Sequence, residues 1–247
     1  MDRRFVDRQP VYLQLREILR AQIESGEYPP GAKLPSENEL AALYKIGRLT
    51  IRSSLSALAL EGLVRSVQGK GVFVLGPKIP RDMETLGGFK QTMTAQNRRA
   101  STRILERSLR PAGPYYARLF GMDAKEGLFY VRRLLRADDE PVSLEEVFVR
   151  QAAVPKFSEF DPGVFSIYEI YDMLHVTVTE AVQRLDLAVP DVSQARLLGT
   201  QPGQAVLHFR CLSSNEAGEV LEYASTYTRS DMCSYSIHFE KRGCNGI

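Results

Sequence analysis

The order of elements expected in the first 74 residues constrains this chain more than any other feature. Apolar residues recur at helical spacing between positions 11 and 25, which predicts a first helix. Ser36, followed three residues later by Glu39, is the signature of a capping box and predicts a short second helix ending near Tyr44. After a tight turn at 45–47, a third helix is expected from about Arg48 to Glu61.

A β-hairpin is expected directly after the third helix. Two runs rich in β-branched residues, 63–67 and 72–74, flank the glycine-rich segment 68–71. Three helices followed by a hairpin are typical of a winged helix-turn-helix domain, which we predict for residues 1–75. Residues 76–84 are rich in turn-forming proline and glycine and are predicted to be a linker. Residues 85–247 alternate strands and helices, so the chain as a whole is predicted to be α+β.

The third helix carries polar side chains suited to contact DNA. Arg48, Thr50 and Arg52 lie at its amino-terminal end, opposite an apolar stripe formed by Ile51, Leu55 and Leu58. Arginine can donate two hydrogen bonds to guanine, and threonine can contact a base methyl group or a phosphate. Residues 1–76 hold 11 Lys and Arg against 8 Asp and Glu, whereas the remainder holds 21 against 22. This asymmetry also favours nucleic acid as a partner of the first domain.

Four segments carry a specific resemblance. Residues 34–41 (LPSENELA), 48–55 (RLTIRSSL), 60–64 (LEGLV) and 68–74 (QGKGVFV) closely resemble the DNA-binding domain of the GntR family. The resemblance implies a homodimer on a palindromic operator, usually as a repressor. The DNA contacts that it implies fall on Ser36, Asn38, Arg48, Thr50, Arg52, Gly69 and Lys70.

Two positions depart from the family pattern. Asn38 stands where arginine is common, and Gly47 replaces the usual serine before the third helix. Glycine still serves as an N-cap at a cost of a few tenths of a kcal/mol. The change at 38 matters more, because asparagine prefers adenine where arginine prefers guanine.

A weak internal repeat occurs in the second domain. Residues 117–121 (ARLFG) are echoed by 195–199 (ARLLG), and the pairs Leu144-Glu145 and Leu221-Glu222 follow at similar distances. Arg133 and Arg210 each precede their glutamate by 12 residues. The repeat predicts two related helix-plus-hairpin halves in one sheet, although so short a match also arises by chance.

The second domain resembles the UTRA effector domain of the HutC branch of the same family. The resemblance is carried by 128–133 (LFYVRR), 139–145 (DEPVSLE), 166–168 (SIY) and 221–224 (LEYA), with Arg229 and Asp231 after them. It implies a mainly antiparallel sheet, a fold related to chorismate lyase and a pocket for a small polar metabolite. The effector set that it implies is Phe89, Arg133, Glu145, Ser166, Tyr168 and Glu222.

An arginine beside a glutamate supports such a pocket independently. If the hairpin turn centres on Asp139, positions summing to 278 pair across it, and Arg133 faces Glu145. Such a pair can bind an anion and a hydroxyl group, or it can be a structural ion pair. Tyr168 is equally compatible with a core position, and Ser166 with a helix cap.

The chemical class of the ligand stays open between a sugar phosphate and a carboxylate or sugar acid. Leu135 and Lys90 stand where sugar-phosphate-sensing relatives often have a second arginine and a serine, although Lys90 restores a positive charge. We therefore expect a small, anionic metabolite.

Other classes of protein fit less well. The charged start and the lack of about 20 consecutive apolar residues predict neither a signal peptide nor a membrane span, so a cytoplasmic protein is expected. Cys211, Cys233 and Cys244 lack metal-ligand spacing, and we expect no metal and no cofactor. Two alternatives to a ligand-controlled regulator remain: a DNA-binding protein without a ligand, and a lyase-like enzyme.

Overall fold

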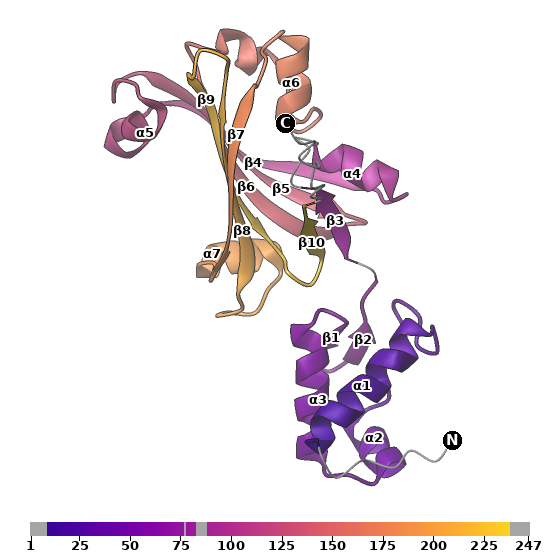
Figure 1. Ribbon diagram of the computed structural model, residues 1–247. Coiled ribbons are helices and arrows are strands. Elements are labelled where there is room, and N and C mark those ends of the chain that lie inside the picture. Colours follow the sequence, from indigo (N-terminus) through magenta and orange to yellow (C-terminus); the bar gives the residue numbers. More distant parts are fainter. Residues whose placement is uncertain (1–8, 77, 83–87, 238–247) are drawn as a thin grey trace, which may run out of the picture. The chain divides into compact units, whose positions relative to one another are not determined.

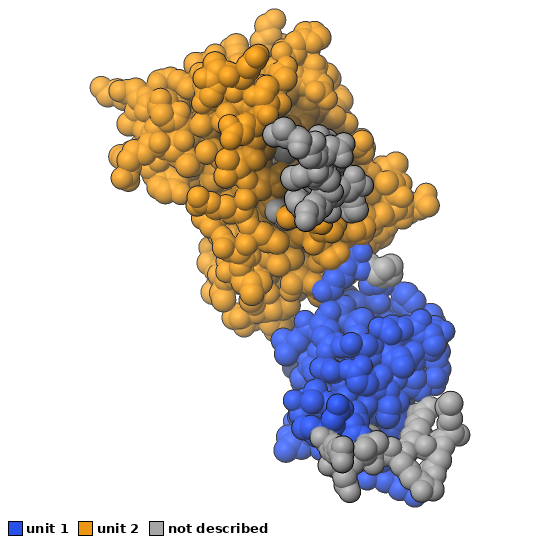
Figure 2. All heavy atoms as spheres, in the orientation of Figure 1, with its two compact units in different colours: residues 1–78 blue, residues 79–247 orange. Residues whose placement is uncertain are grey.

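The computed structural model describes residues 9–76, 78–82 and 88–237. The chain divides into two compact units, residues 1–78 and 79–247, coloured separately in Figure 2. Within the segment predicted as a linker, 76–84, residues 79–82 form a strand of unit 2, and residues 77, 83 and 84 lie outside the described part. Of the three cysteines, Cys211 and Cys233 are buried free thiols, and Cys244 lies outside the described part.

Unit 1 contains the predicted elements in the predicted order. They are α1 (Val11–Glu24), α2 (Glu37–Tyr44), α3 (Arg48–Leu60), β1 (Val64–Val67) and β2 (Gly71–Val74) (Figure 1). The stripe of Ile51, Leu55 and Leu58 is buried against apolar residues of α1 and α2, as the spacing predicts. The two strands pair antiparallel, with Val67 opposite Gly71.

Local signals set the limits of these helices. Ser36 caps α2 in a complete capping box, since its hydroxyl accepts from the Glu39 N–H and the Glu39 carboxylate accepts from the Ser36 N–H. Lys45 adopts a left-handed conformation (φ 55°) and ends α2, so the chain turns sharply into α3.

Unit 2 is built on a six-stranded antiparallel sheet, and its described elements are as follows. They are β3 (Ile79–Asp82), α4 (Phe89–Ala95), β4 (Ala100–Pro111), α5 (Gly113–Phe120), β5 (Gly127–Ala137), β6 (Glu140–Arg150), η1 (Pro155–Glu159), α6 (Ile167–Met173), β7 (Glu180–Ala188), α7 (Val192–Leu198), β8 (Val206–Ser214), β9 (Val220–Thr228) and β10 (Cys233–Ser236). The large sheet has the order β4-β5-β6-β9-β8-β7, and β3 pairs in parallel with β10. The predicted α+β class with a mainly antiparallel sheet is confirmed.

The two halves suggested by the repeat are present. From either edge to the centre of the sheet, the chain runs strand, helix, strand, strand: β4-α5-β5-β6 in one half and β7-α7-β8-β9 in the other (Figure 1). Gly121 and Gly199 end the two helices in the same left-handed conformation. The halves meet where β6 pairs with β9.

The arginines and glutamates of the repeat do not correspond in space. Arg133 faces Glu145, but Arg210 faces Ser225, and Glu222 faces Ser213. Partners in the β5–β6 hairpin sum to 278, so residues 12 apart such as Arg133 and Glu145 share a face, whereas partners in the β8–β9 hairpin sum to 435 (210 + 225). A register that differs by an odd number of residues turns a side chain to the other face of a sheet, so Arg210 points away from the face that carries Glu222 and Arg133.

The hairpin between β5 and β6 follows the predicted pairing over most of its length. Positions summing to 278 are opposite one another from Leu128 to Leu135, and the register then shifts by one residue. Asp138 and Asp139 both have positive φ and form a two-residue turn, so the turn does not centre on Asp139 alone.

Different helices cover the two faces of the sheet (Figure 1). We call the side packed by α4 and α6 the α6 face, and the side packed by α5 and α7 the α5 face. On the α6 face, Ile170 and Tyr171 are buried against valines of β5 and β6. On the α5 face, Phe120 packs with Tyr130 and Phe148, and Leu198 packs with Leu144.

One carboxyl group is almost completely buried on the α6 face, next to the Tyr171 hydroxyl. Glu222 is 2% exposed, and its Oε2 accepts no hydrogen bond from the described residues. Burial raises the pKa of Glu222 to about 7, and the negative charge of Glu145 acts in the same direction. The group is therefore partly protonated near neutral pH.

This raised pKa predicts a loss of stability as the pH rises. The folded protein holds a proton on Glu222 that the unfolded chain, with a pKa of about 4.3, has released. The free energy of unfolding should therefore fall between about pH 4.5 and 7 and level off above. Glu222→Gln should flatten this dependence in denaturant titrations, and Glu216→Gln, in an exposed turn, should not. Parallel pH curves for wild type and Glu222→Gln would contradict the prediction.

Candidate functional site

The residues predicted to contact DNA lie on the amino-terminal ends of α2 and α3 and on the tip of the β1–β2 hairpin. Ser36 and Asn38 are exposed at the start of α2. The Ser36 N–H is bonded to the Glu39 carboxylate at 2.7 Å, so a phosphate would have to approach other groups at this helix end. Arg48 begins α3, and Gly47 caps it without a side-chain bond.

Glu37 organises the two arginines of α3, and sequence reasoning missed it. Its carboxylate accepts from Nε and a terminal nitrogen of Arg52, at 3.1 and 2.8 Å, and lies 3.8 Å from Arg48. The hydrogen bond to Arg52 holds the pKa of Glu37 below its usual range. The arginine side chains remain 63% and 60% exposed, so both are available to a partner.

Leu49 adds an apolar group to the same end of α3. It is 78% exposed between Arg48 and the half-buried Thr50. An exposed leucine at the start of such a helix can make an apolar contact with a thymine methyl group.

The hairpin tip is a tight turn that presents a cation. Gly69 has φ +72°, and the Lys70 N–H donates to the Val67 carbonyl at 3.0 Å. Gly71 has φ +117°, and a Cβ there would lie 2.6 Å from the Lys33 side chain. Backbone conformation therefore favours glycine at 71, since the flexible end of Lys33 can move aside for a Cβ, and Gly69 and Lys70 are exposed.

In unit 2, Arg133 and Glu145 form a buried ion pair on the α6 face. The Arg133 Nε donates to Glu145, and one terminal nitrogen donates to the carbonyls of Pro162 and Phe165 at 2.7 and 3.5 Å. The Arg133 side chain is 8% exposed and that of Glu145 is 16%. The structural ion pair that the sequence left open is therefore present, and it also ties β5 to the segment before α6.

Ser166 and Tyr168 lie at the start of α6. Ser166 caps the helix in a capping box with Glu169, at 3.1 and 2.6 Å. The Tyr168 hydroxyl lies 3.4 Å from the Ser213 hydroxyl, and burial raises the pKa of the phenol. Both residues thus have the structural roles that the sequence allowed for them.

The remaining residues of the predicted effector set are Phe89, Lys90 and Glu222. Phe89 is buried in the cluster that includes Ile79 and Leu135, whereas Lys90 is exposed. A Cβ at Gly88 would lie 2.7 Å from the Ser166 Cβ, so α4 and α6 begin in close contact. Glu222 interacts electrostatically with Arg133 and Glu145. The structure therefore pairs Arg133 with Glu145 directly, whereas Glu222 lies on the same face but opposite Val149, four residues along β9 from the partner of Glu145.

Two features are absent from the described residues. No helix there is long and apolar enough to cross a bilayer. Within the same ranges, no three His, Cys, Asp or Glu side chains are grouped to hold a metal ion.

Family comparisons cover both units. A family described as "Bacterial regulatory proteins, gntR family" matches residues 11–74, and the UTRA domain matches residues 95–234. The transcriptional repressor NagR of Bacillus subtilis is 28% identical over 235 residues, covering 94% of this chain and 96% of NagR. The histidine utilization repressor of Pseudomonas aeruginosa is 26% identical over 203 residues, covering 81% and 80%.

Solved structures support the same fold. PhnF from Mycobacterium smegmatis matches 94% of this chain and all of its own, with a TM-score of 0.66 and 23% identity. NagR and the histidine utilization repressor are transcriptional repressors, so the prediction of a transcriptional regulator is confirmed. The lyase-like alternative finds no support among these relatives. The chain belongs to the gntR family of bacterial regulatory proteins and carries that family's DNA-binding domain followed by a UTRA domain.

Proposed function

We propose that this regulator represses a metabolic operon in the cytoplasm and that a small anionic metabolite controls it. In this proposal, residues 1–75 bind DNA, 76–84 link the domains, and 85–247 bind the effector and form the dimer. The observation that carries the proposal is the exposed cationic end of α3, where Glu37 orients Arg48 and Arg52. The buried Arg133–Glu145 pair supports the effector site.

The DNA interface combines base contacts with phosphate contacts. Arg48, Thr50 and Arg52 address base edges, and Asn38 adds a preference for adenine. Gly69 and Lys70 approach the minor groove and a phosphate, and Ser36 contacts the backbone next to α2. When the domain binds DNA, Arg52 gives up one of its two hydrogen bonds to Glu37 and donates to DNA instead.

Replacing Arg48 and Lys70 separates these two kinds of contact. Arg48→Ala should remove about 1–3 kcal/mol of discrimination between operator and unrelated DNA. Lys70→Ala should weaken binding to all sequences alike and flatten the salt dependence by about one unit. Operator titrations at several salt concentrations measure both. An unchanged specificity ratio in Arg48→Ala would place base recognition elsewhere.

The regulator is proposed to act as a symmetric homodimer on a palindromic operator. One winged helix contacts too few base pairs for a specific site, and a two-fold axis doubles the contact. The free protein at micromolar concentration should have twice the chain mass of 27.8 kDa, and its complex with operator should exceed the mass of the DNA by the same amount. A monomeric mass under both conditions excludes the dimer.

The effector site is proposed between Arg133, Glu145 and Glu222, with Phe89, Lys90, Ser166 and Tyr168 around it. An acidic group on the ligand takes the place of the Pro162 and Phe165 carbonyls on Arg133, and ligand hydroxyls bond to the glutamates. A polar ligand would stabilise the buried Oε2 of Glu222, which accepts no hydrogen bond from the described residues. Displacing those carbonyls moves the segment before α6.

Arginine substitutions on opposite faces of β5 test this site. In calorimetric titrations, Arg133→Ala should lose affinity for anionic metabolites of the pathway that the adjacent genes encode. Arg132→Ala is the matched control, because Arg132 is next in sequence but pairs with Glu146 on the α5 face. Equal affinity in wild type and Arg133→Ala removes Arg133 from the site.

Binding should also change operator affinity. A typical coupling energy of about 1–3 kcal/mol corresponds to a change of roughly 5- to 150-fold. Ligand binding without any effect on operator affinity would instead favour a DNA-binding protein that no ligand controls.

A further inference from the structure

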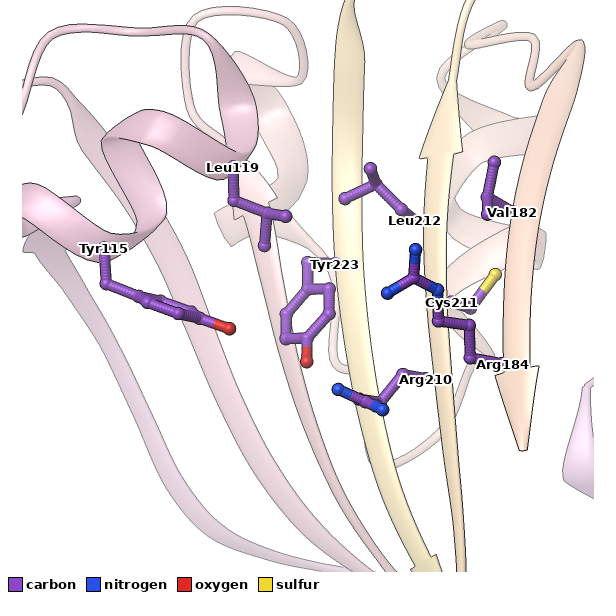
Figure 3. A pocket seen from close by; sticks show the side chains of 8 residues that line it. All are labelled: Tyr115, Leu119, Val182, Arg184, Arg210, Cys211, Leu212 and Tyr223. Atoms are coloured by element: carbon purple, nitrogen blue, oxygen red, sulfur yellow. The ribbon is translucent and has the colours of Figure 1, made fainter. Parts of the chain in front are cut away.

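A cavity lies on the α5 face, on the opposite side of the sheet from the proposed effector site. It has a volume of about 160 Å³ and opens between α5 and the strands β7, β8 and β9 (Figure 3). Its lining consists of Tyr115, Leu119, Val182, Arg184, Arg210, Cys211, Leu212 and Tyr223. The Cys211 side chain belongs to the cluster on the α6 face, so only the backbone of β8 at Cys211 borders the cavity. This backbone separates the cavity from the α6 face.

Two arginines are direct neighbours at this cavity. Arg184 and Arg210 are opposite one another in the β7–β8 pairing, so their side chains leave the sheet on the same side. Like charges at directly opposed positions destabilise a sheet. Figure 3 shows both guanidinium groups directed toward Tyr223. The sheet therefore concentrates positive charge at one wall of the cavity.

Only part of this charge is neutralised. Asp186 accepts from a terminal nitrogen of Arg210, whose Nε is buried without a hydrogen-bond partner. Arg184 is exposed and has no carboxylate within 4 Å among the described residues. One positive charge thus remains, together with unused N–H donors.

The rest of the cavity is apolar with phenolic edges. Tyr223, Leu212 and Val182 form one row across β9, β8 and β7. Leu119 and Tyr115 of α5 form the opposite wall (Figure 3). Burial raises the pKa of Tyr223, so this phenol stays neutral and can donate a hydrogen bond at neutral pH.

We propose that this cavity binds a small monocarboxylate with an aromatic or branched apolar body. The carboxylate bonds to Arg184 and Arg210, and the body lies against Leu119, Val182 and Leu212. A cavity of roughly 150 Å³ accommodates benzene, so the volume suits one ring. A phosphate dianion fits less well, because one net positive charge is present and the apolar row offers it no donors.

Benzoate is the probe, titrated into the full chain by calorimetry, with benzyl alcohol as the neutral analogue of the same shape. Wild type should bind benzoate at least tenfold more tightly than benzyl alcohol. Arg184→Gln should weaken benzoate binding about tenfold or more, because a charge-assisted hydrogen bond is lost. Val182→Trp should do the same by filling the cavity from a half-exposed strand position.

Two variants give the controls. Arg103→Gln removes an exposed arginine from β4, the opposite edge strand, and should leave benzoate affinity unchanged. Arg133→Ala should also leave it unchanged, which separates this cavity from the proposed effector site.

Three outcomes overturn the proposal. The first is equal affinity for benzoate and benzyl alcohol, or no binding of benzoate. The second is loss of benzoate binding in Arg133→Ala but not in Arg184→Gln, which places the probe on the α6 face. The third is a change from dimer to monomer in Arg184→Gln and Val182→Trp without benzoate binding to wild type, which makes this surface a contact between chains.

Discussion

The alternation of side chains across the six-stranded sheet is the constraint on which unit 2 depends. Arg132 and Arg133 are adjacent, yet one pairs with Glu146 on the α5 face and the other with Glu145 on the α6 face. Each pairing requires the β5–β6 register that places position 133 opposite 145. A shift by one residue would bury Arg132 under α6 and expose Arg133, so the register, and not composition, decides which charges are buried.

Unit 1 was predictable almost to the residue because its signals are local. The capping box at Ser36, the turn at 45–47 and the apolar stripe of α3 each act within a few residues. The contact between Glu37 and Arg52 was missed for the opposite reason, since it joins two helices whose angle no local pattern specifies. In unit 2, the repeat predicted the two halves but misaligned Arg210, because the two hairpins pair in different registers, with 133 opposite 145 in one and 210 opposite 225 in the other.

Burial determines how the candidate effector residues behave without a ligand. Arg133 is stabilised by Glu145 and by two backbone carbonyls, so removing either charge would leave the other buried and unpaired, at about 3–5 kcal/mol. Glu222 forms no ion pair within the described residues, and burial raises its pKa instead. The sequence predicted which residues gather on the α6 face, but their bonds to one another depend on the segment 162–166, which lacks regular spacing.

Strand β9 connects the two faces most directly. Glu222 is buried on the α6 face, and the next residue, Tyr223, lines the cavity on the α5 face. Adjacent residues in a strand share a peptide plane, so a rotation of the backbone that releases one side chain must also move the other. A ligand that binds either face more tightly in one backbone position changes affinity at the other face by the same factor, because such coupling is reciprocal. An open sheet with helices covering parts of both faces therefore gives the two proposed sites one shared layer of backbone.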